Sequence, residues 1–302
     1  MDRKILVACK VPSSSISSIR RLGGEVAVSE TQLPKDLGQF DAVLIRGNVK
    51  ADSNFLSRLK KGCALIRLGV GLDNVDLEAA KQFGIRVCNT PCSSSVSVAE
   101  HALGLMLALA KNLVQMDKSV KSGTWPKHDY KGLELRGKTL GVVGFGCSGK
   151  ELAKLAKALG MTILAYDKYE PVGADIKADY DELLSRSDFI SFHVPLTEET
   201  RGLLDIAHLE VLKRGVFIIN TSRGEVVSAR ALLMGLEQGI IAGAGIDVLP
   251  HEPPKTVEEN RLAKDPRVII TPHVAGNTKE AEEKSVDMAC SILEKLWKER
   301  CG

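Results

Sequence analysis

Three polar side chains follow predicted buried strands in the second half of the chain. Arg223 lies in Asn220-Thr221-Ser222-Arg223-Gly224, Glu252 lies a few residues after the predicted strand 242–246, and His273 lies in Thr271-Pro272-His273. Arginine binds a carboxylate through two parallel hydrogen bonds because its guanidinium is a planar fork. Histidine exchanges protons near neutral pH, and a neighbouring carboxylate orients the imidazole and favours its charged form. Arg223, Glu252 and His273 could therefore bind an organic acid and exchange a proton with its hydroxyl group.

A glycine-rich turn adds a second kind of site. Gly144-Phe145-Gly146-Cys147-Ser148-Gly149 has the spacing G-x-G-x-x-G between a predicted strand (138–143) and a predicted helix (150–159). The first glycine permits a tight turn, the second lets a pyrophosphate approach the backbone, and the third lets helix and strand pack closely. The first N–H groups of the helix have no internal partners and can donate to phosphate. This order of elements predicts a dinucleotide site.

Asp167 ends the next predicted strand, roughly 20 residues beyond the glycines, where a carboxylate binds the ribose hydroxyls of NAD. The same charge would repel the 2′-phosphate of NADP, so NAD is the expected cofactor. With a nicotinamide present, Arg223, Glu252 and His273 would complete the requirements for hydride transfer to or from a 2-hydroxy acid.

Each of these three residues taken singly has an ordinary alternative. Arg223 could be a surface cation, Glu252 a solvated loop charge, and His273 a hydrogen-bonded histidine after a proline. Their joint placement after strands of a dinucleotide-binding lobe favours the catalytic interpretation, because open α/β sheets bind ligands at the carboxyl ends of their strands.

Length and composition limit the possibilities further. The chain has 302 residues, of which 44% are hydrophobic and 26% charged, as expected for a globular protein with two domains. Its net charge of +3 is spread without long blocks and does not indicate nucleic-acid binding. The seven cysteines form no C-x-x-C pair, and no metal site is predicted. Because the apolar runs at 5–9 and 102–110 are too short for a signal peptide core or a membrane span, we predict a cytoplasmic protein.

Apolar strands alternate with helical segments through the whole chain, which predicts an α/β fold with parallel sheets. Residues 95–116 are apolar on nearly all sides and predict one long buried helix. Residues 206–212 are also predicted to be helical. Asn277 with Glu280 predicts a capping box for a last helix that runs to about Lys298. The other predicted strands lie at 5–9, 26–28, 42–45, 64–67, 85–88, 161–166, 189–194, 217–220, 242–246 and 268–270.

Several longer motifs occur in order along nearly the whole chain. They are Gly69-Val70-Gly71-Leu72-Asp73-Asn74-Val75-Asp76, Ser97-Val98-Ala99-Glu100-His101, the glycine turn, His193-Val194-Pro195-Leu196-Thr197, the Arg223 segment, residues 247–253 and Thr271-Pro272-His273. On these motifs the chain resembles the D-isomer-specific 2-hydroxyacid dehydrogenases, most of all the short members that act on 3-phosphoglycerate.

The resemblance implies two doubly wound parallel-sheet lobes. A Rossmann NAD-binding domain, residues 95–276, would be inserted into a flavodoxin-like substrate-binding domain, residues 1–94 and 277–302. The family also implies that the substrate binds in a cleft between the lobes, and that two copies form a homodimer through the cofactor domain.

The resemblance also implies residue roles. Arg223 matches the substrate-binding arginine, Glu252 its partner carboxylate, and His273 the general acid/base. The implied cofactor contacts are Gly144, Gly146, Cys147, Ser148, Gly149, Asp167, His193, Val194, Pro195, Thr221, Ser222, Asp247, His273 and Gly276, with Asp167 on the adenosine ribose and Asp247 on the nicotinamide amide. The chain departs from the family at Cys147-Ser148, where relatives often have Arg-Ile, and at residues 92–95, where they often carry glycine and asparagine.

The substrate is the least determined point. The family implies that Arg46, Lys50, Val70, Gly71, Arg223 and His273 contact it, and Arg67 is a further candidate. Arg46 and Lys50 match cations that would hold a phosphate, although Gly47 stands where the family has a serine. We therefore predict oxidation of 3-phosphoglycerate to 3-phosphohydroxypyruvate, in serine biosynthesis. The alternatives are a reductase of hydroxypyruvate, glyoxylate or another 2-oxo acid, and a non-catalytic NAD sensor similar to the transcriptional corepressors of this fold.

Overall fold

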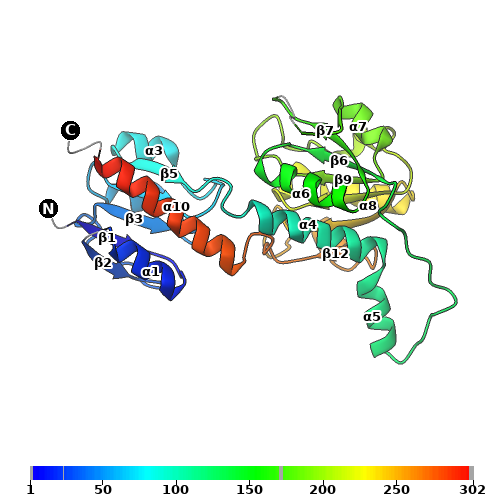
Figure 1. Ribbon diagram of the computed structural model, residues 1–302, viewed down its shortest axis with the longest axis horizontal. Helices are drawn as coiled ribbons and strands as arrows, with labels where there is room; N and C mark the ends of the chain where they lie inside the picture. The colour runs from blue at the N-terminus through cyan, green and yellow to red at the C-terminus, as the bar shows by residue number, and fades with distance from the viewer. Residues whose placement is uncertain (1–2, 23, 170–172, 299–302) are drawn as a thin grey trace. The chain divides into compact units, whose positions relative to one another are not determined.

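The computed structural model describes residues 3–22, 24–169 and 173–298, and its chain divides into two compact units (Figure 1). One unit joins residues 1–94 to residues 277–302, and the other comprises residues 95–276. Within the described residues, none of the helices combines the length and the hydrophobicity that a membrane span requires.

The first unit is built on a five-stranded parallel sheet with the order β2-β1-β3-β4-β5. This is the flavodoxin-like strand order. Its elements are β1 (Lys4–Val7), α1 (Ser13–Arg20), β2 (Glu25–Val28), β3 (Ala42–Ile45), α2 (Ser53–Ser57), β4 (Ala64–Arg67), α3 (Leu77–Gln82), β5 (Arg86–Asn89) and α10 (Lys279–Lys298).

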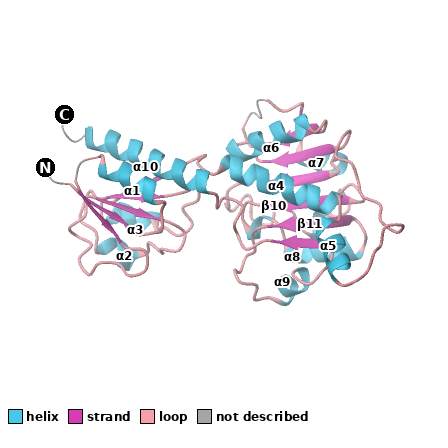
Figure 2. Ribbon diagram, turned by 60° about the horizontal axis from the view of Figure 1, so that its bottom comes forward, coloured by secondary structure: helices cyan, strands magenta, loops and turns pink. Residues whose placement is uncertain are grey.

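Both faces of this sheet are buried, because alternate residues of β1, β3 and β4 belong to two separate cores. One face packs against α2 and α3, and the other against α1 and the apolar side of α10, which includes Val286, Leu293 and Trp297. Figure 2 shows α1 and α10 together on this second face. The last helix of the chain thus completes the core of the unit that begins it.

The second unit is built on a seven-stranded parallel sheet with the order β12-β11-β10-β9-β6-β7-β8. The order reverses at β6, as it does at the first strand of a Rossmann fold. The predicted fold class of two parallel α/β lobes is therefore confirmed. The elements are α4 (Ser95–Ala110), α5 (Leu113–Lys121), β6 (Thr139–Val143), α6 (Cys147–Ala158), β7 (Thr162–Tyr166), β8 (Ile176–Lys177), α7 (Tyr180–Arg186), β9 (Phe189–Phe192), η1 (Ile206–His208), β10 (Val216–Asn220), η2 (Gly224–Val226), α8 (Ala229–Glu237), β11 (Ile241–Ile246), α9 (Val257–Leu262) and β12 (Val268–Ile270).

Several element predictions are wrong in detail. The helix predicted over 95–116 is two helices, because Asn112 has a left-handed backbone (φ 47°) that no right-handed helix can continue. Residues 206–212 form only a short 3₁₀ turn at Ile206–His208. The last helix is capped by Thr278, whose Oγ1 accepts from the Ala281 N–H at 3.2 Å, and not by Asn277. The strand β8 and the helix α9 were not predicted.

Candidate active site

The glycine turn lies between β6 and α6, as its sequence predicts. Gly144 has φ +90°, and a Cβ there would come within 2.7 Å of the His193 carbonyl oxygen. A Cβ on Gly149 would lie 2.2 Å from the Gly144 carbonyl oxygen, so the helix packs directly on the turn. A Cβ on Gly146, in contrast, would meet no atom within 4 Å. Gly144 and Gly149 are thus required by the fold, whereas Gly146 leaves open space at the first turn of α6, where a pyrophosphate would bind.

Asp167 follows β7 and faces this turn. Its Oδ2 accepts from the Phe145 N–H and its Oδ1 from the Tyr169 N–H at 2.8 Å. The neighbouring Lys168 forms an ion pair with Glu199 (Nζ–Oε2 2.8 Å), and the hydrogen bond and charge of Glu199 raise the pKa of Lys168. Because Lys168 is neutralised by Glu199, the local charge beside the turn stays negative, which fits NAD better than NADP.

His193 follows β9 on the other side of the turn. Its imidazole Nε2 lies 2.8 Å from the Ser191 Oγ, and the backbone N–H of His193 donates to the Val143 carbonyl oxygen. Burial lowers the pKa of His193 to about 4. The imidazole is therefore neutral at pH 7, and His193 contributes shape and hydrogen bonding rather than charge.

The Arg223 segment follows β10 and is held by Asn220, a buried residue that sequence reasoning missed. The Asn220 Oδ1 accepts from the N–H and Oγ of Ser222, and its Nδ2 donates to the Arg223 carbonyl oxygen at 2.9 Å. Thr221 Oγ1 is buried and has no hydrogen-bond partner in the described part of the chain. A buried hydroxyl without a hydrogen bond costs free energy unless a bound molecule forms a hydrogen bond with it. Its position after β10 suits a contact with a dinucleotide.

Glu252 and His273 lie together. The Glu252 Oε2 is 2.8 Å from the His273 Nδ1, and the Glu252 Oε1 accepts from the Leu249 N–H at 3.3 Å. A carboxylate at Nδ1 leaves Nε2 as the nitrogen that can exchange a proton with another group. The Arg223 segment packs closely against the same loop, since a Cβ on Gly224 would lie 2.1 Å from the Leu249 carbonyl carbon.

His273 itself has a left-handed backbone (φ 55°), which is uncommon for a residue with a side chain. Asp247 holds this conformation. Its carbonyl oxygen accepts from the His273 N–H, and its buried carboxylate accepts from the N–H groups of Val274 and Ala275 and from the Thr271 hydroxyl. The Thr271 hydroxyl is also 3.0 Å from His101 Nε2 on α4. Asp247 thus shapes the loop that presents the imidazole.

The residues predicted to contact substrate in the first unit follow its strands in the same way. Arg46 follows β3, and its Nη1 donates to the Glu282 Oε1 of α10 at 2.9 Å. Lys50 is exposed. Val70 and Gly71 lie in the loop after β4, where the Asn89 Nδ2 donates to the Val70 carbonyl oxygen. Sequence reasoning missed Glu282, because it lies more than 230 residues from Arg46 on the last helix.

Comparison with known proteins decides the family. The model of the D-isomer specific 2-hydroxyacid dehydrogenase NAD-binding domain matches residues 103–275. The chain belongs to the D-isomer-specific 2-hydroxyacid dehydrogenase family. The predicted family, and the prediction of NAD as cofactor, are therefore confirmed.

Individual relatives of this dehydrogenase family differ in their names. The chain is 41% identical to a D-3-phosphoglycerate dehydrogenase of Archaeoglobus fulgidus over 92% of this chain and 54% of that protein. It is 40% identical to a hydroxypyruvate reductase of Thermotoga maritima over 91% of both chains. The structure matches a D-lactate dehydrogenase of Aquifex aeolicus in complex with NAD and lactic acid, with a TM-score of 0.82 and 30% identity over 98% of this chain and 96% of that one. The chain spans about half the length of the phosphoglycerate dehydrogenases it matches.

Sequence reasoning also missed the pair formed by Glu259 and His251 in the second unit. Glu259, on α9, is 2% exposed and accepts from the N–H groups of Lys255 and Thr256, and its Oε1 lies 2.9 Å from the His251 Nδ1. Burial alone would raise the pKa of Glu259, but these hydrogen bonds outweigh it and lower the pKa to about 2. Glu259 therefore fixes the loop that carries Glu252. The capping-box spacing of Thr256 and Glu259 at the start of α9 is the sequence signal that could have found it.

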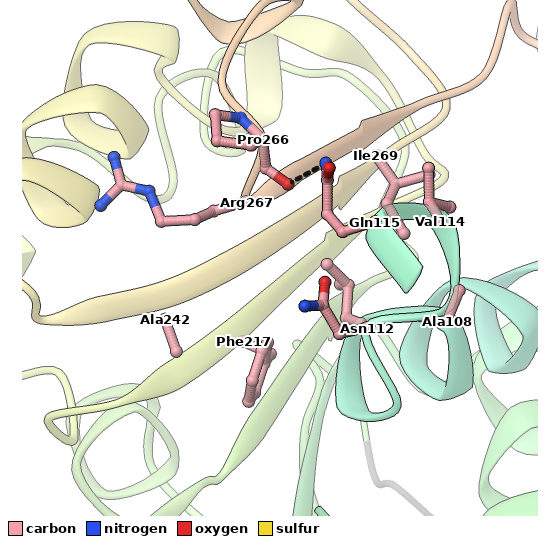
Figure 3. Close-up of a pocket in the computed structure, with 10 residues that line it drawn as sticks. Ala108, Asn112, Val114, Gln115, Phe217, Ala242, Pro266, Arg267 and Ile269 are labelled. Atoms are coloured by element: carbon pink, nitrogen blue, oxygen red, sulfur yellow. Dashed lines mark hydrogen bonds between the residues drawn. The ribbon is translucent and has the colours of Figure 1, made fainter. Parts of the chain in front are cut away.

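A cavity of about 320 Å³ lies elsewhere in the second unit (Figure 3). It is lined by residues near the amino ends of β10, β11 and β12 and by the junction of α4 and α5, where Gln115 donates to the Pro266 carbonyl oxygen. Arg223, Glu252 and His273 follow the carboxyl ends of these three strands, and the glycine turn follows the carboxyl end of β6 in the same parallel sheet. The cavity is therefore not the predicted active site.

Proposed function

We propose that this chain catalyses NAD-dependent hydride transfer at C2 of a D-2-hydroxy acid, with Arg223, Glu252 and His273 as its catalytic residues. The observation that carries the proposal is the 2.8 Å contact between the Glu252 carboxylate and the His273 Nδ1 in a unit that matches an NAD-binding domain. The relatives named above are dehydrogenases or reductases, and nothing in them favours the corepressor-like alternative.

Each residue has a defined task in the proposed reaction. The Arg223 guanidinium binds the substrate carboxylate and so orients C2. His273 Nε2 takes the proton of the 2-hydroxyl group as the C2 hydride departs, and returns it in the reverse direction. Glu252 holds the imidazole through Nδ1 and stabilises the imidazolium that forms. NAD, when bound, accepts the hydride.

We propose 3-phosphoglycerate as the substrate, oxidised to 3-phosphohydroxypyruvate. Three of the relatives most similar in sequence are named D-3-phosphoglycerate dehydrogenases. Arg46, with Lys50 and the Val70-Gly71 loop, follows strands of the first unit at the sheet edge where open α/β sheets bind ligands. Arg46 and Lys50 would supply the positive charge that a phosphate requires.

A specific observation favours hydroxypyruvate as the second candidate substrate. Arg46 already forms an ion pair with Glu282, and hydroxypyruvate has no phosphate that would need that arginine. The relative from Thermotoga maritima, which is matched over 91% of its length, is named a hydroxypyruvate reductase.

The test is a panel of 2-oxo acids, with and without phosphate, assayed by loss of NADH absorbance. We expect turnover with 3-phosphohydroxypyruvate or hydroxypyruvate and with NADH in preference to NADPH. Tight NADH binding without reduction of any 2-oxo acid would contradict the proposed activity and support an NAD sensor.

We also propose that two copies associate through the second unit, as the family implies. Helix α5 has no buried residue, and Leu113, Val120 and Trp125 are exposed apolar side chains on and after it. Exposed apolar groups of this kind commonly mark a protein interface. Light scattering should give a dimer for the unaltered chain and a monomer for Leu113→Asp. The control Leu159→Asp, at another exposed leucine, should stay dimeric; a monomeric unaltered chain would contradict the proposal.

A further inference from the structure

The ion pair between Arg46 and Glu282 lies at the carboxyl edge of the five-stranded sheet. Arg46 is the first residue after β3, and Glu282 belongs to the first turn of α10, 236 residues later. The Nη1–Oε1 distance is 2.9 Å, and the two side chains are 22% and 32% exposed. The carboxylate therefore neutralises the arginine, yet both remain accessible to a small anion.

Hydrogen bonds fix the backbone around Arg46, and a second arginine, Arg67, lies against the adjacent Gly47. The Asn74 Nδ2 donates to the carbonyl oxygens of Arg46 and Val49, which fixes the backbone of this loop. The Arg67 guanidinium lies against Gly47 and Gly69, the glycines of the loops after β3 and β4. The Cys9 thiol near Arg46 stays protonated, because burial raises its pKa to about 11. Glu282 is thus the charge in direct contact with Arg46.

We infer that Glu282 is a specificity-determining residue that disfavours substrates with a second anionic group. The inference rests on the proposed function. A phosphate that binds Arg46 either takes Nη1 from Glu282 or binds another nitrogen of the same guanidinium, and in both cases it lies close to the Glu282 carboxylate, which is also negative. A substrate that ends in a neutral hydroxyl places no second negative charge beside Glu282. Glu282 therefore shifts the balance from phosphorylated to unphosphorylated three-carbon acids.

The test compares two substrates in three forms of the full chain. The ratio of kcat/KM for 3-phosphohydroxypyruvate to kcat/KM for hydroxypyruvate is measured in the unaltered chain, in Glu282→Gln and in the control Glu283→Gln. Glu283 is the adjacent acid on α10 and contacts Ser14. We expect the ratio to rise roughly tenfold in Glu282→Gln, because the competing charge is lost while the amide can still accept from Arg46. The control should change the ratio less than about twofold.

Two further measurements connect the effect to Arg46. Arg46→Gln should lower the ratio of the two kcat/KM values. In the double variant Arg46→Gln/Glu282→Gln the ratio should stay nearly as low, because Glu282 affects phosphate binding only where Arg46 is present. Inorganic phosphate should inhibit hydroxypyruvate reduction more strongly in Glu282→Gln than in the unaltered chain. Glu282→Ala repeats both assays if the glutamine variant is unstable in a thermal melt.

An unchanged or lower ratio in both Glu282 variants, with turnover retained, would overturn the inference and leave the proposed function intact. Absence of turnover with any 2-oxo acid in the unaltered chain would contradict the proposed function, and this inference with it.

Discussion

The carboxyl edges of the two sheets hold their polar residues in different ways. In the seven-stranded sheet, Asn220 and Asp247 are buried and each is fixed by three or more hydrogen bonds within its own unit. In the five-stranded sheet, Asn74 fixes the backbone of Arg46, but the guanidinium forms a partly exposed ion pair. Buried networks are costly to rearrange, whereas an exposed ion pair contributes little to stability. The contrast agrees with the proposal that the second unit holds the catalytic residues and that the first unit contributes to substrate choice.

The largest expected effect is the difference in kcat/KM between substitutions of Arg223 and of Arg46. Arg223→Gln should lower kcat/KM for every 2-oxo acid by about a thousandfold, because it removes the guanidinium that binds the carboxylate common to all of them. Arg46→Gln should lower it by about tenfold to a hundredfold for phosphorylated substrates and little for the others. Steady-state kinetics on the same panel measure both. If both variants lowered kcat/KM equally for all substrates, the two units could not be assigned different roles in catalysis and in substrate choice.

A substitution of Glu259 tests whether its carboxylate stabilises the loop that carries Glu252. Its pKa of about 2 lies below that of an unfolded glutamate, so its contribution to stability is present above about pH 4.5 and lost as the pH falls toward 2. Glu259→Gln should therefore cost about 3 kcal/mol of unfolding free energy at pH 7, and the difference from the unaltered chain should shrink in acid.

Urea denaturation at pH 7 and at pH 3 measures this difference. Glu258→Gln, at the partly exposed neighbour of Glu259 on α9, is the control and should change the free energy little at either pH. If the loss of unfolding free energy in Glu259→Gln were the same at pH 7 and at pH 3, the charge of the Glu259 carboxylate would not be what stabilises the loop.

The glycine turn offers a matched pair of substitutions. Gly149→Ala should destabilise the unit, since its Cβ would lie 2.2 Å from the Gly144 carbonyl oxygen. Gly146→Ala meets no protein atom within 4 Å, so it should leave the melting temperature unchanged and weaken NADH binding by about tenfold or more. Thermal melts and fluorescence titration with NADH distinguish them. Unchanged NADH affinity in Gly146→Ala would place the pyrophosphate elsewhere.

The smallest expected effect concerns cofactor choice. Asp167→Ser should raise the ratio of NADPH to NADH turnover by about tenfold, because it removes the carboxylate that repels the 2′-phosphate. Lys168→Ser is the control and should not raise that ratio, since Lys168 is paired with Glu199. An unaltered chain that prefers NADPH would contradict the assignment of Asp167.

Much of this architecture could be predicted from the sequence. The buried strands, the glycine turn and Asp167 were predictable because local hydrophobic period and glycine spacing encode them. The break at Asn112 was not, since a polar residue within an apolar run does not reveal a left-handed backbone. Glu282 was missed because its partner Arg46 lies 236 residues away, and only the fold brings the two together. Asn220 binds groups within three residues of itself, in a turn that has no hydrophobic period to indicate these contacts. Glu259 lies at the capping-box spacing from Thr256, which is a local signal of its role.

The most direct test of the central claim is a single-turnover measurement of NADH absorbance with the chain in excess. Mixed with NADH and hydroxypyruvate or 3-phosphohydroxypyruvate, the unaltered chain should consume NADH rapidly. His273→Ala should bind NADH with about the same affinity and consume it roughly a thousandfold more slowly. Equal rates in the two forms would contradict the assignment of His273 as the acid/base of the reaction.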